Sequence, residues 1–146
     1  MQYIEAPEVY DGHEPSLFLA GGITGCLDWQ KEVVARLQGL PLVIFNPRRS
    51  RFSLHGSAER EQVVWEYTYL RKATAISFWF PEETLCPITL YELGAWSMTD
   101  KKIFLGVHPN YPKLQNIRVQ TALVRPDVSL VQTLEELCGC IRSWKG

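Results

Sequence analysis

The sequence predicts a single α/β domain with a central, mostly parallel sheet of about five strands and helices on both faces of that sheet. Two observations support this prediction. Short apolar runs alternate along the chain with segments in which apolar residues recur at helical spacing. The chain has 146 residues and a hydrophobic fraction of 46%, which suits one domain with one core and no interior linker.

The first predicted strand and helix surround a glycine pair. Residues 17–20 are apolar and run into Gly21 and Gly22, which predicts a buried strand that ends in a tight turn. Asp28 can cap the helix that follows. In that helix, four apolar residues form one face: Trp29, Val33, Leu37 and Leu40.

A second unit follows directly. Residues 42–45 are apolar and are closed by Asn46 and a proline, as expected for a strand. Residues 49–58 are polar and lack periodicity, which predicts a long loop. Helical spacing returns over residues 59–72, with one apolar row predicted along the helix: Val63, Tyr67, Leu70 and Ala73.

The second half continues the alternation, and residues 1–15 form a polar N-terminal extension. Such alternation is typical of a Rossmann- or flavodoxin-like sheet, in which ligands bind beyond the carboxyl ends of the strands. The loops that begin at Gly21, Asn46, Pro81 and His108 should therefore meet at one site. The remaining predicted elements are strand 75–80, loop 81–87, helix 88–99, strand 102–107, loop 108–115, strand 128–131 and helix 133–143.

Charge and composition exclude several classes of protein. The net charge of −1 argues against a nucleic-acid partner, and the short basic cluster of Arg48, Arg49 and Arg51 suits at most one small anion. There is no signal peptide and no apolar run long enough for a membrane span, so we expect a cytoplasmic protein. Neither the four scattered cysteines nor the three separated histidines predict a metal site: Cys26, Cys86, Cys138, Cys140, His13, His55 and His108.

Two segments that follow predicted strands contain residues suited to ligand binding. Gly21 and Gly22 allow the backbone to approach a ligand, although a simple tight turn explains them equally well. The segment has the pattern of neither a P-loop nor a dinucleotide-binding loop. Asn46 and Arg48 can bond a hydroxyl, a base edge or a phosphate, and the alternative is a turn with a solvated arginine.

Three polar residues lie within predicted helices. Gln62 and Glu66 are four residues apart and share one helix face, predicted to be opposite the apolar row; solvent exposure is their simplest explanation. Glu92 is different, because it lies in an apolar stretch and Gly94 leaves space beside it. A carboxylate among apolar neighbours is costly unless it has a function, which makes Glu92 the strongest candidate for chemistry.

Several of these segments together resemble the nucleoside 2-deoxyribosyltransferases, and more closely the branch described as deoxyribosyltransferase-like. The resemblance covers about residues 16–122, in order and at compatible spacing. Its most specific part is the Glu-Leu-Gly segment at Glu92. The matching segments are residues 18–23 (FLAGGI), 28–29 (DW), 46–48 (NPR), 65–66 (WE), 73–74 (AT) and 91–94 (YELG).

The resemblance implies an enzyme without a cofactor that acts on deoxynucleosides and free nucleobases, with Glu92 as nucleophile. Glu66 occupies the place of the acidic residue that holds and protonates the base. The family completes each site with a neighbouring subunit of a homo-oligomer, through an Asn in the loop after the fourth strand. Asn116 matches that place, and Arg118 would make the next contact.

Two departures from the family pattern leave the substrate open. Many members carry a sugar-binding Asp six residues before the nucleophile, where this chain has Cys86, with Glu83 nearby as a substitute. Arg118 replaces an apolar residue and suits a 5'-phosphate. Two alternatives therefore remain: an N-glycosidase that hydrolyses deoxynucleosides or their 5'-monophosphates, with Arg48 or Arg118 on the phosphate, and a nucleotide-binding module without catalysis.

Overall fold

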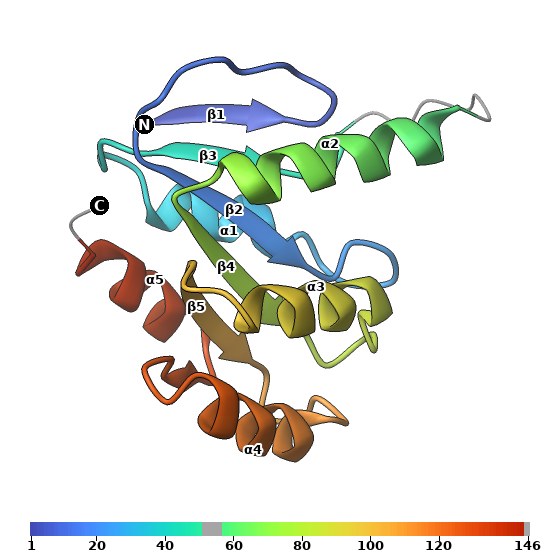
Figure 1. Cartoon of the computed structure of the whole chain (residues 1–146), viewed down its shortest axis with the longest axis vertical. Coiled ribbons are helices and arrows are strands. Elements are labelled where there is room, and N and C mark those ends of the chain that lie inside the picture. Colours follow the sequence, from blue (N-terminus) through green and yellow to red (C-terminus); the bar gives the residue numbers. More distant parts are fainter. Residues whose placement is uncertain (51–56, 145–146) are drawn as a thin grey trace.

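The computed structural model describes residues 1–50 and 57–144 and has a six-stranded sheet. The sheet lies between two layers of helices (Figure 1). Every pair of neighbouring strands is parallel, and the strand order is β1-β3-β2-β4-β5-β6. This confirms the α/β fold class. The strands are β1 Gln2–Glu5, β2 Ser16–Gly21, β3 Val43–Asn46, β4 Ala75–Phe80, β5 Lys102–Val107 and β6 Leu130–Val131; the helices are α1 Trp29–Arg36, α2 Ala58–Lys72, α3 Pro87–Ser97, α4 Leu114–Val124 and α5 Leu134–Arg142.

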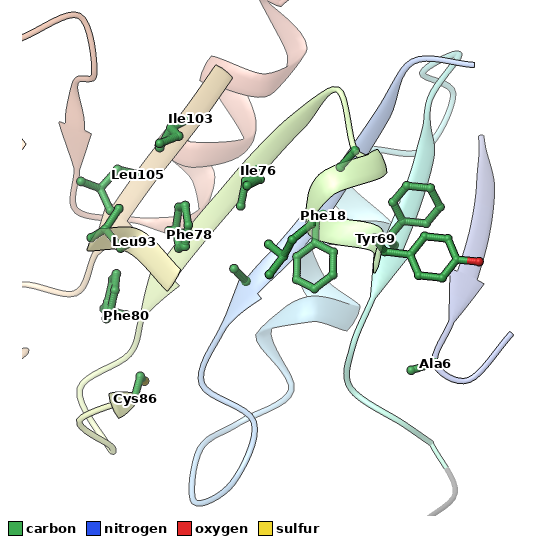
Figure 2. Close-up of a cluster of buried hydrophobic side chains, with 14 of the residues drawn as sticks. Ala6, Phe18, Tyr69, Ile76, Phe78, Phe80, Cys86, Leu93, Ile103 and Leu105 are labelled. Carbon is green, nitrogen blue, oxygen red and sulfur yellow. The ribbon is translucent and has the colours of Figure 1, made fainter. Parts of the chain in front are cut away.

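Each face of the sheet has its own hydrophobic core. One core joins strand residues to α2, α3 and α4, and Figure 2 shows part of it, with Phe18, Phe78 and Leu105 from neighbouring strands and Leu93 from α3. The other core joins the opposite strand faces to α1 and α5 through residues such as Val33. Both cores follow from the period of two in the strands, whose side chains alternate between faces.

The N-terminal segment, expected to be a polar extension, contributes a sixth strand. Residues Gln2–Glu5 form β1, which pairs with β3 at the edge of the sheet. Ile4 is the one buried residue of this strand, so the apolar signal of an internal strand is absent from the sequence. Helix α4 was also not predicted from the sequence. It has no acidic residue in its first turn and no side-chain cap, which are the usual signals of a helix start.

Helix α2 buries a different face from the predicted one. Leu70 and Ala73 are buried as expected, but Val63 and Tyr67 are 58% and 56% exposed. The buried positions are instead Trp65 and Tyr69. The predicted apolar row was therefore wrong at Val63 and Tyr67. The helix is rotated relative to the prediction, and the face that carries Gln62 and Glu66 is turned inward.

The sheet brings its ligand-binding edge to the junction of β2 and β4. The chain leaves β2 toward α1 on one face of the sheet and leaves β4 toward α3 on the other, as Figure 1 shows. Such a switch point opens a crevice beyond the carboxyl ends of the two strands. None of the helices in the described ranges is long and apolar enough to cross a membrane.

Candidate active site

A pocket of about 670 Å³ opens at this edge, between the loop after β2 and helices α2 and α3. Its volume lies in the range of pockets that hold small organic ligands. Three carboxylates, one arginine and one amide line a wall that is otherwise largely apolar. The lining residues are Phe18, Ala20, Gly21, Gly22, Ile23, Thr24, Pro47, Arg49, Ala58, Glu59, Gln62, Val63, Glu66, Thr84, Cys86, Pro87, Ile88, Thr89 and Glu92.

The glycine pair lines the pocket and is also required by packing. A Cβ on Gly21 would collide with the indole of Trp29, and one on Gly22 would lie 3.0 Å from the sulfurs of Cys26 and Cys86. The backbone of Gly22 is held in place by the same helix, because its carbonyl oxygen accepts hydrogen bonds from Trp29 Nε1 at 2.9 Å and Gln30 Nε2 at 3.2 Å. The loop therefore presents a fixed backbone surface to a ligand.

Glu92 lies in the second turn of α3 and points into the pocket. The helix begins with Pro87, whose missing N–H costs nothing at a first helical position. Burial raises the pKa of Glu92 to about 8, and the negative charge of Glu66 is the second, smaller cause of this rise. No hydrogen bond from a described residue stabilises the ionised form of Glu92. The carboxyl group is therefore largely neutral below about pH 8, and it must lose its proton before it can act as a nucleophile.

Glu66 lies opposite on α2 and belongs to a chain of hydrogen bonds. Gln62 Nε2 donates to Glu66 Oε1 at 2.7 Å, and Arg49 Nε donates to Gln62 Oε1 at 2.6 Å. Burial raises the pKa of Glu66, while the hydrogen bond from Gln62 and the charge of Arg49 act in the opposite direction. The two glutamates therefore differ in environment. Glu66 is connected through Gln62 to the cation Arg49, a chain of hydrogen bonds that we call the relay. Glu92 has no such connection among the described residues.

Asn46 and Arg48, both expected to bind substrate, do not line the pocket. Asn46 Nδ2 donates to Tyr3 Oη at 2.8 Å, and its Oδ1 accepts from the Arg48 backbone N–H at 3.0 Å, so the side chain ties β1 to the end of β3. The guanidinium of Arg48 donates to the carbonyls of Leu27 at 2.9 Å and Cys26 at 3.1 Å. Arg48 thus braces the glycine loop, and its neighbour Arg49 is the arginine of the pocket.

The segment before α3 and the first turn of α3 supply hydroxyl groups in place of the expected carboxylate. Glu83 is exposed and does not line the pocket, whereas Thr84 and Thr89 do. Cys86 lines it too, at a left-handed position with φ 50, and burial raises the pKa of its thiol to about 12. The thiol is therefore neutral. Sequence reasoning missed both threonines, since a Thr in a loop or first helical turn carries no distinctive signal.

Asn116 and Arg118 lie on helix α4 and not in a loop, which corrects the expected position. Both are exposed, and neither lines the pocket. Their side chains are engaged within the helix, since Asn116 accepts a hydrogen bond from Gln120 and Arg118 donates to Gln115 at 3.4 Å. Any contact that they make with a ligand would have to be in a neighbouring copy of the chain.

Fold and pocket together define a small α/β protein that holds two carboxylates of raised pKa in a largely apolar, ligand-sized pocket at the edge of a parallel sheet. The sequence profile of the family described as nucleoside 2-deoxyribosyltransferase like matches residues 14–111. The chain belongs to this family. The matched region contains β2 to β5 and every residue that lines the pocket. No curated protein matches the sequence.

Proposed function

We propose that this protein transfers the 2-deoxyribosyl group between the nucleobases of 2'-deoxynucleosides, with Glu92 as nucleophile and Glu66 as proton donor and acceptor. The observation that carries the proposal is the pair of carboxylates of raised pKa in one pocket of a chain from this family. Pairs of carboxylates in unequal environments divide nucleophilic and acid–base roles between them. The partners are then small molecules, deoxynucleosides and free bases.

The first half-reaction breaks the bond between C1' and the base nitrogen. Glu92 attacks C1' through an oxocarbenium-like transition state and forms an ester bond to the sugar, as in a retaining glycosidase. The electron pair of the broken bond stays on the base nitrogen, and Glu66 gives its proton to the departing base. A largely apolar pocket favours this step, since it desolvates the attacking carboxylate.

The second half-reaction reverses the first with a different base. The nitrogen of the incoming base attacks C1', its proton passes to Glu66, and the ester bond breaks to regenerate the Glu92 carboxylate. Two inversions return the sugar with its original configuration. If water attacks in place of the base, the same steps give hydrolysis.

The electrostatics support one shared proton between the two carboxylates. The negative charge of Glu66 adds to the effect of burial on the pKa of Glu92, so the pair keeps one proton until about pH 8. This proton must pass from Glu92, which has no hydrogen-bond partner among the described residues, to Glu66 to give the reactive arrangement with the charge on Glu92. The hydroxyl groups of Thr84 and Thr89 are the candidates for holding the sugar, because they line the same pocket.

The family resemblance also supports a homo-oligomer in which a neighbouring copy adds Asn116 or Arg118 to the site. Exposed apolar side chains on α3 fit such packing, since Ile88 is 65% and Tyr91 is 78% exposed. Light scattering of the purified protein tests this part of the proposal, with a monomeric but active protein as the contrary result.

The function is tested with 2'-deoxyinosine or thymidine and free adenine, followed by chromatography of the products. We expect 2'-deoxyadenosine from the wild type, none from Glu92→Ala, and the wild-type rate from Glu8→Gln, an exposed carboxylate away from the pocket. Free base and deoxyribose without exchange would indicate a hydrolase, for which deoxynucleoside 5'-monophosphates are the next substrates. Binding without any cleavage, unchanged in Glu92→Gln, would leave only a binding module.

A further inference from the structure

Arg49 is a buried cation in the pocket for which the proposed chemistry has no direct use. Only 7% of its side chain is exposed, although it lies in a segment rich in polar residues. Its Nε donates to Gln62 Oε1 at 2.6 Å, and one of its terminal nitrogens contacts Glu61 Oε1 at 3.1 Å. The buried position of a charged side chain indicates a specific electrostatic task.

The contact with Arg49 fixes the amide of Gln62 in one orientation. A guanidinium only donates hydrogen bonds, so the group of Gln62 that faces it must be the oxygen. The amide nitrogen must then face the other way, where it donates to the carbonyl oxygen of Pro47 at 2.7 Å and to Glu66 Oε1 at 2.7 Å. A flipped amide would place its oxygen against both acceptors. Gln62 therefore has no free donor and no second arrangement.

This arrangement commits one oxygen of Glu66 and leaves the other for a ligand. Oε1 accepts from Gln62, which favours the ionised carboxylate, and no donor among the described residues contacts Oε2, which can therefore bind a base. The relay opposes the effect of burial, which raises the pKa of Glu66. The other titratable groups of the pocket are Glu92 and Cys86 from the α3 side and Glu59 on α2 itself, so Arg49 is the single cation in its described lining.

We propose that Arg49, acting through Gln62, is a positioning residue that keeps Glu66 ionised and correctly oriented to accept the proton of the incoming base. This inference rests on the proposed function. In the glycosylated enzyme Glu92 is a neutral ester, and Arg49 is the charged group that, through Gln62, favours the ionised form of Glu66. Glu66 must then take the proton from the base nitrogen while the N–C1' bond forms and the ester bond to Glu92 breaks.

The first test needs no substrate. We would titrate the Glu66 carboxyl by NMR in protein with ¹³C-labelled glutamate, with the signal assigned by its loss in Glu66→Gln. Arg49→Met and Gln62→Leu should each raise the pKa of Glu66, and adding Arg49→Met to Gln62→Leu should shift it much less than Arg49→Met alone. The matched control, Arg60→Met, removes an exposed arginine of α2 outside the pocket and should shift nothing.

The second test follows the covalent intermediate by mass spectrometry of enzyme mixed with thymidine and adenine. Arg49→Met should accumulate the deoxyribosyl adduct on Glu92 and release it to adenine about tenfold more slowly or worse, whereas Arg60→Met should behave as wild type. The inference would be overturned if the pKa of Glu66 in Arg49→Met equalled that in the wild type. It would also be overturned if Arg49→Met shifted this pKa equally in the wild type and in Gln62→Leu. If the wild type forms no adduct, the proposed function fails. The titration then still tests whether Arg49 acts on Glu66 through Gln62.

Discussion

The raised pKa of Glu92 makes the stability of the protein depend on pH in a direction opposite to that of most paired carboxylates. The folded-state pKa of about 8 exceeds the usual value of 4.5 because burial disfavours the ionised form. Between these two values the folded protein binds more protons than the unfolded chain. Stability therefore falls as pH rises through this window, and the contribution of the neutral carboxyl is complete below about pH 4.5.

Glu92→Gln removes this dependence, because the amide has nearly the shape of the carboxyl but cannot ionise. At about 1.4 kcal/mol per pKa unit, a rise from 4.5 to about 8 corresponds to at most about 5 kcal/mol. The side chain retains some exposure, so we expect about 3–5 kcal/mol at pH 9. At pH 4 the variant and the wild type should have the same free energy of unfolding. As pH rises to about 8, the free energy of unfolding of the variant should increase steadily relative to that of the wild type.

The assay is reversible urea unfolding at pH 5, 7 and 9 for the wild type, Glu92→Gln and Glu8→Gln. Glu8 is exposed, so its variant should differ from the wild type by a small, nearly constant amount. In protein that also carries Glu66→Gln, Glu92→Gln should still give most of its pH-dependent stabilisation. Burial is the larger cause of the raised pKa of Glu92, and the charge of Glu66 is the smaller one. A gain from Glu92→Gln that is the same at pH 5 and pH 9 would refute the reasoning.

Three further predictions concern the pocket and its helix. The wild-type kcat/KM for base exchange should fall above about pH 8, where the carboxylate pair loses its last proton; in Glu66→Gln we expect a rate about 10²-fold lower and no such fall, and an unchanged alkaline limb would contradict the assignment. Gly22→Ala should lower the free energy of unfolding by about 1–3 kcal/mol, because its Cβ would lie 3.0 Å from two cysteine sulfurs. Equal stability of the variant and the wild type in urea unfolding would contradict this close packing around Gly22. Gly94→Ala should raise stability by about 0.5–1 kcal/mol, because this helical glycine is exposed and a Cβ would meet nothing within 4 Å; a loss of stability or activity would instead indicate a partner packed against α3.

The strands and the glycine turn could be predicted because their signals are local. Residues 103–107 contain no polar side chain and lie between polar neighbours, and the structure has β5 at Lys102–Val107. The predicted cap of α1 is also confirmed, since Asp28 Oδ1 accepts from the backbone N–H of Lys31 at 3.1 Å. Edge strand β1 escaped prediction because a strand with one covered face and one neighbour needs little apolar sequence.

The orientation of α2 could not be predicted because the helix carries two apolar rows. Val63 and Tyr67 are four residues apart, and so are Trp65 and Tyr69, so spacing alone favours neither row. The tertiary structure selects the larger one: Trp65 packs against Phe18, while Tyr67 stays exposed beneath Arg71, 4.0 Å from its ring centroid. Gln62 and Glu66 are inward-facing as a consequence.

The choice between Arg48 and Arg49 was equally hidden, because two adjacent residues after a strand point in different directions. Arg48 reaches the carbonyl oxygens of the glycine loop, and Arg49 reaches α2. Each position depends on groups far away in the sequence. A basic pair after a strand therefore indicates a cation near the site, while only the fold decides which arginine faces the ligand.

The division of the two glutamates into nucleophile and proton carrier follows from where the positive charge lies. A protein of this size has little stability to spare, and a buried carboxylate without a partner uses a few kcal/mol of it. Arg49 and Gln62 relieve that cost for Glu66 alone. A cation beside Glu92 would stabilise the fold at neutral pH, yet it would also weaken the nucleophile by stabilising its charge before the attack. The uncompensated glutamate is thus the one suited to bond with carbon, and the compensated one is suited to exchange protons.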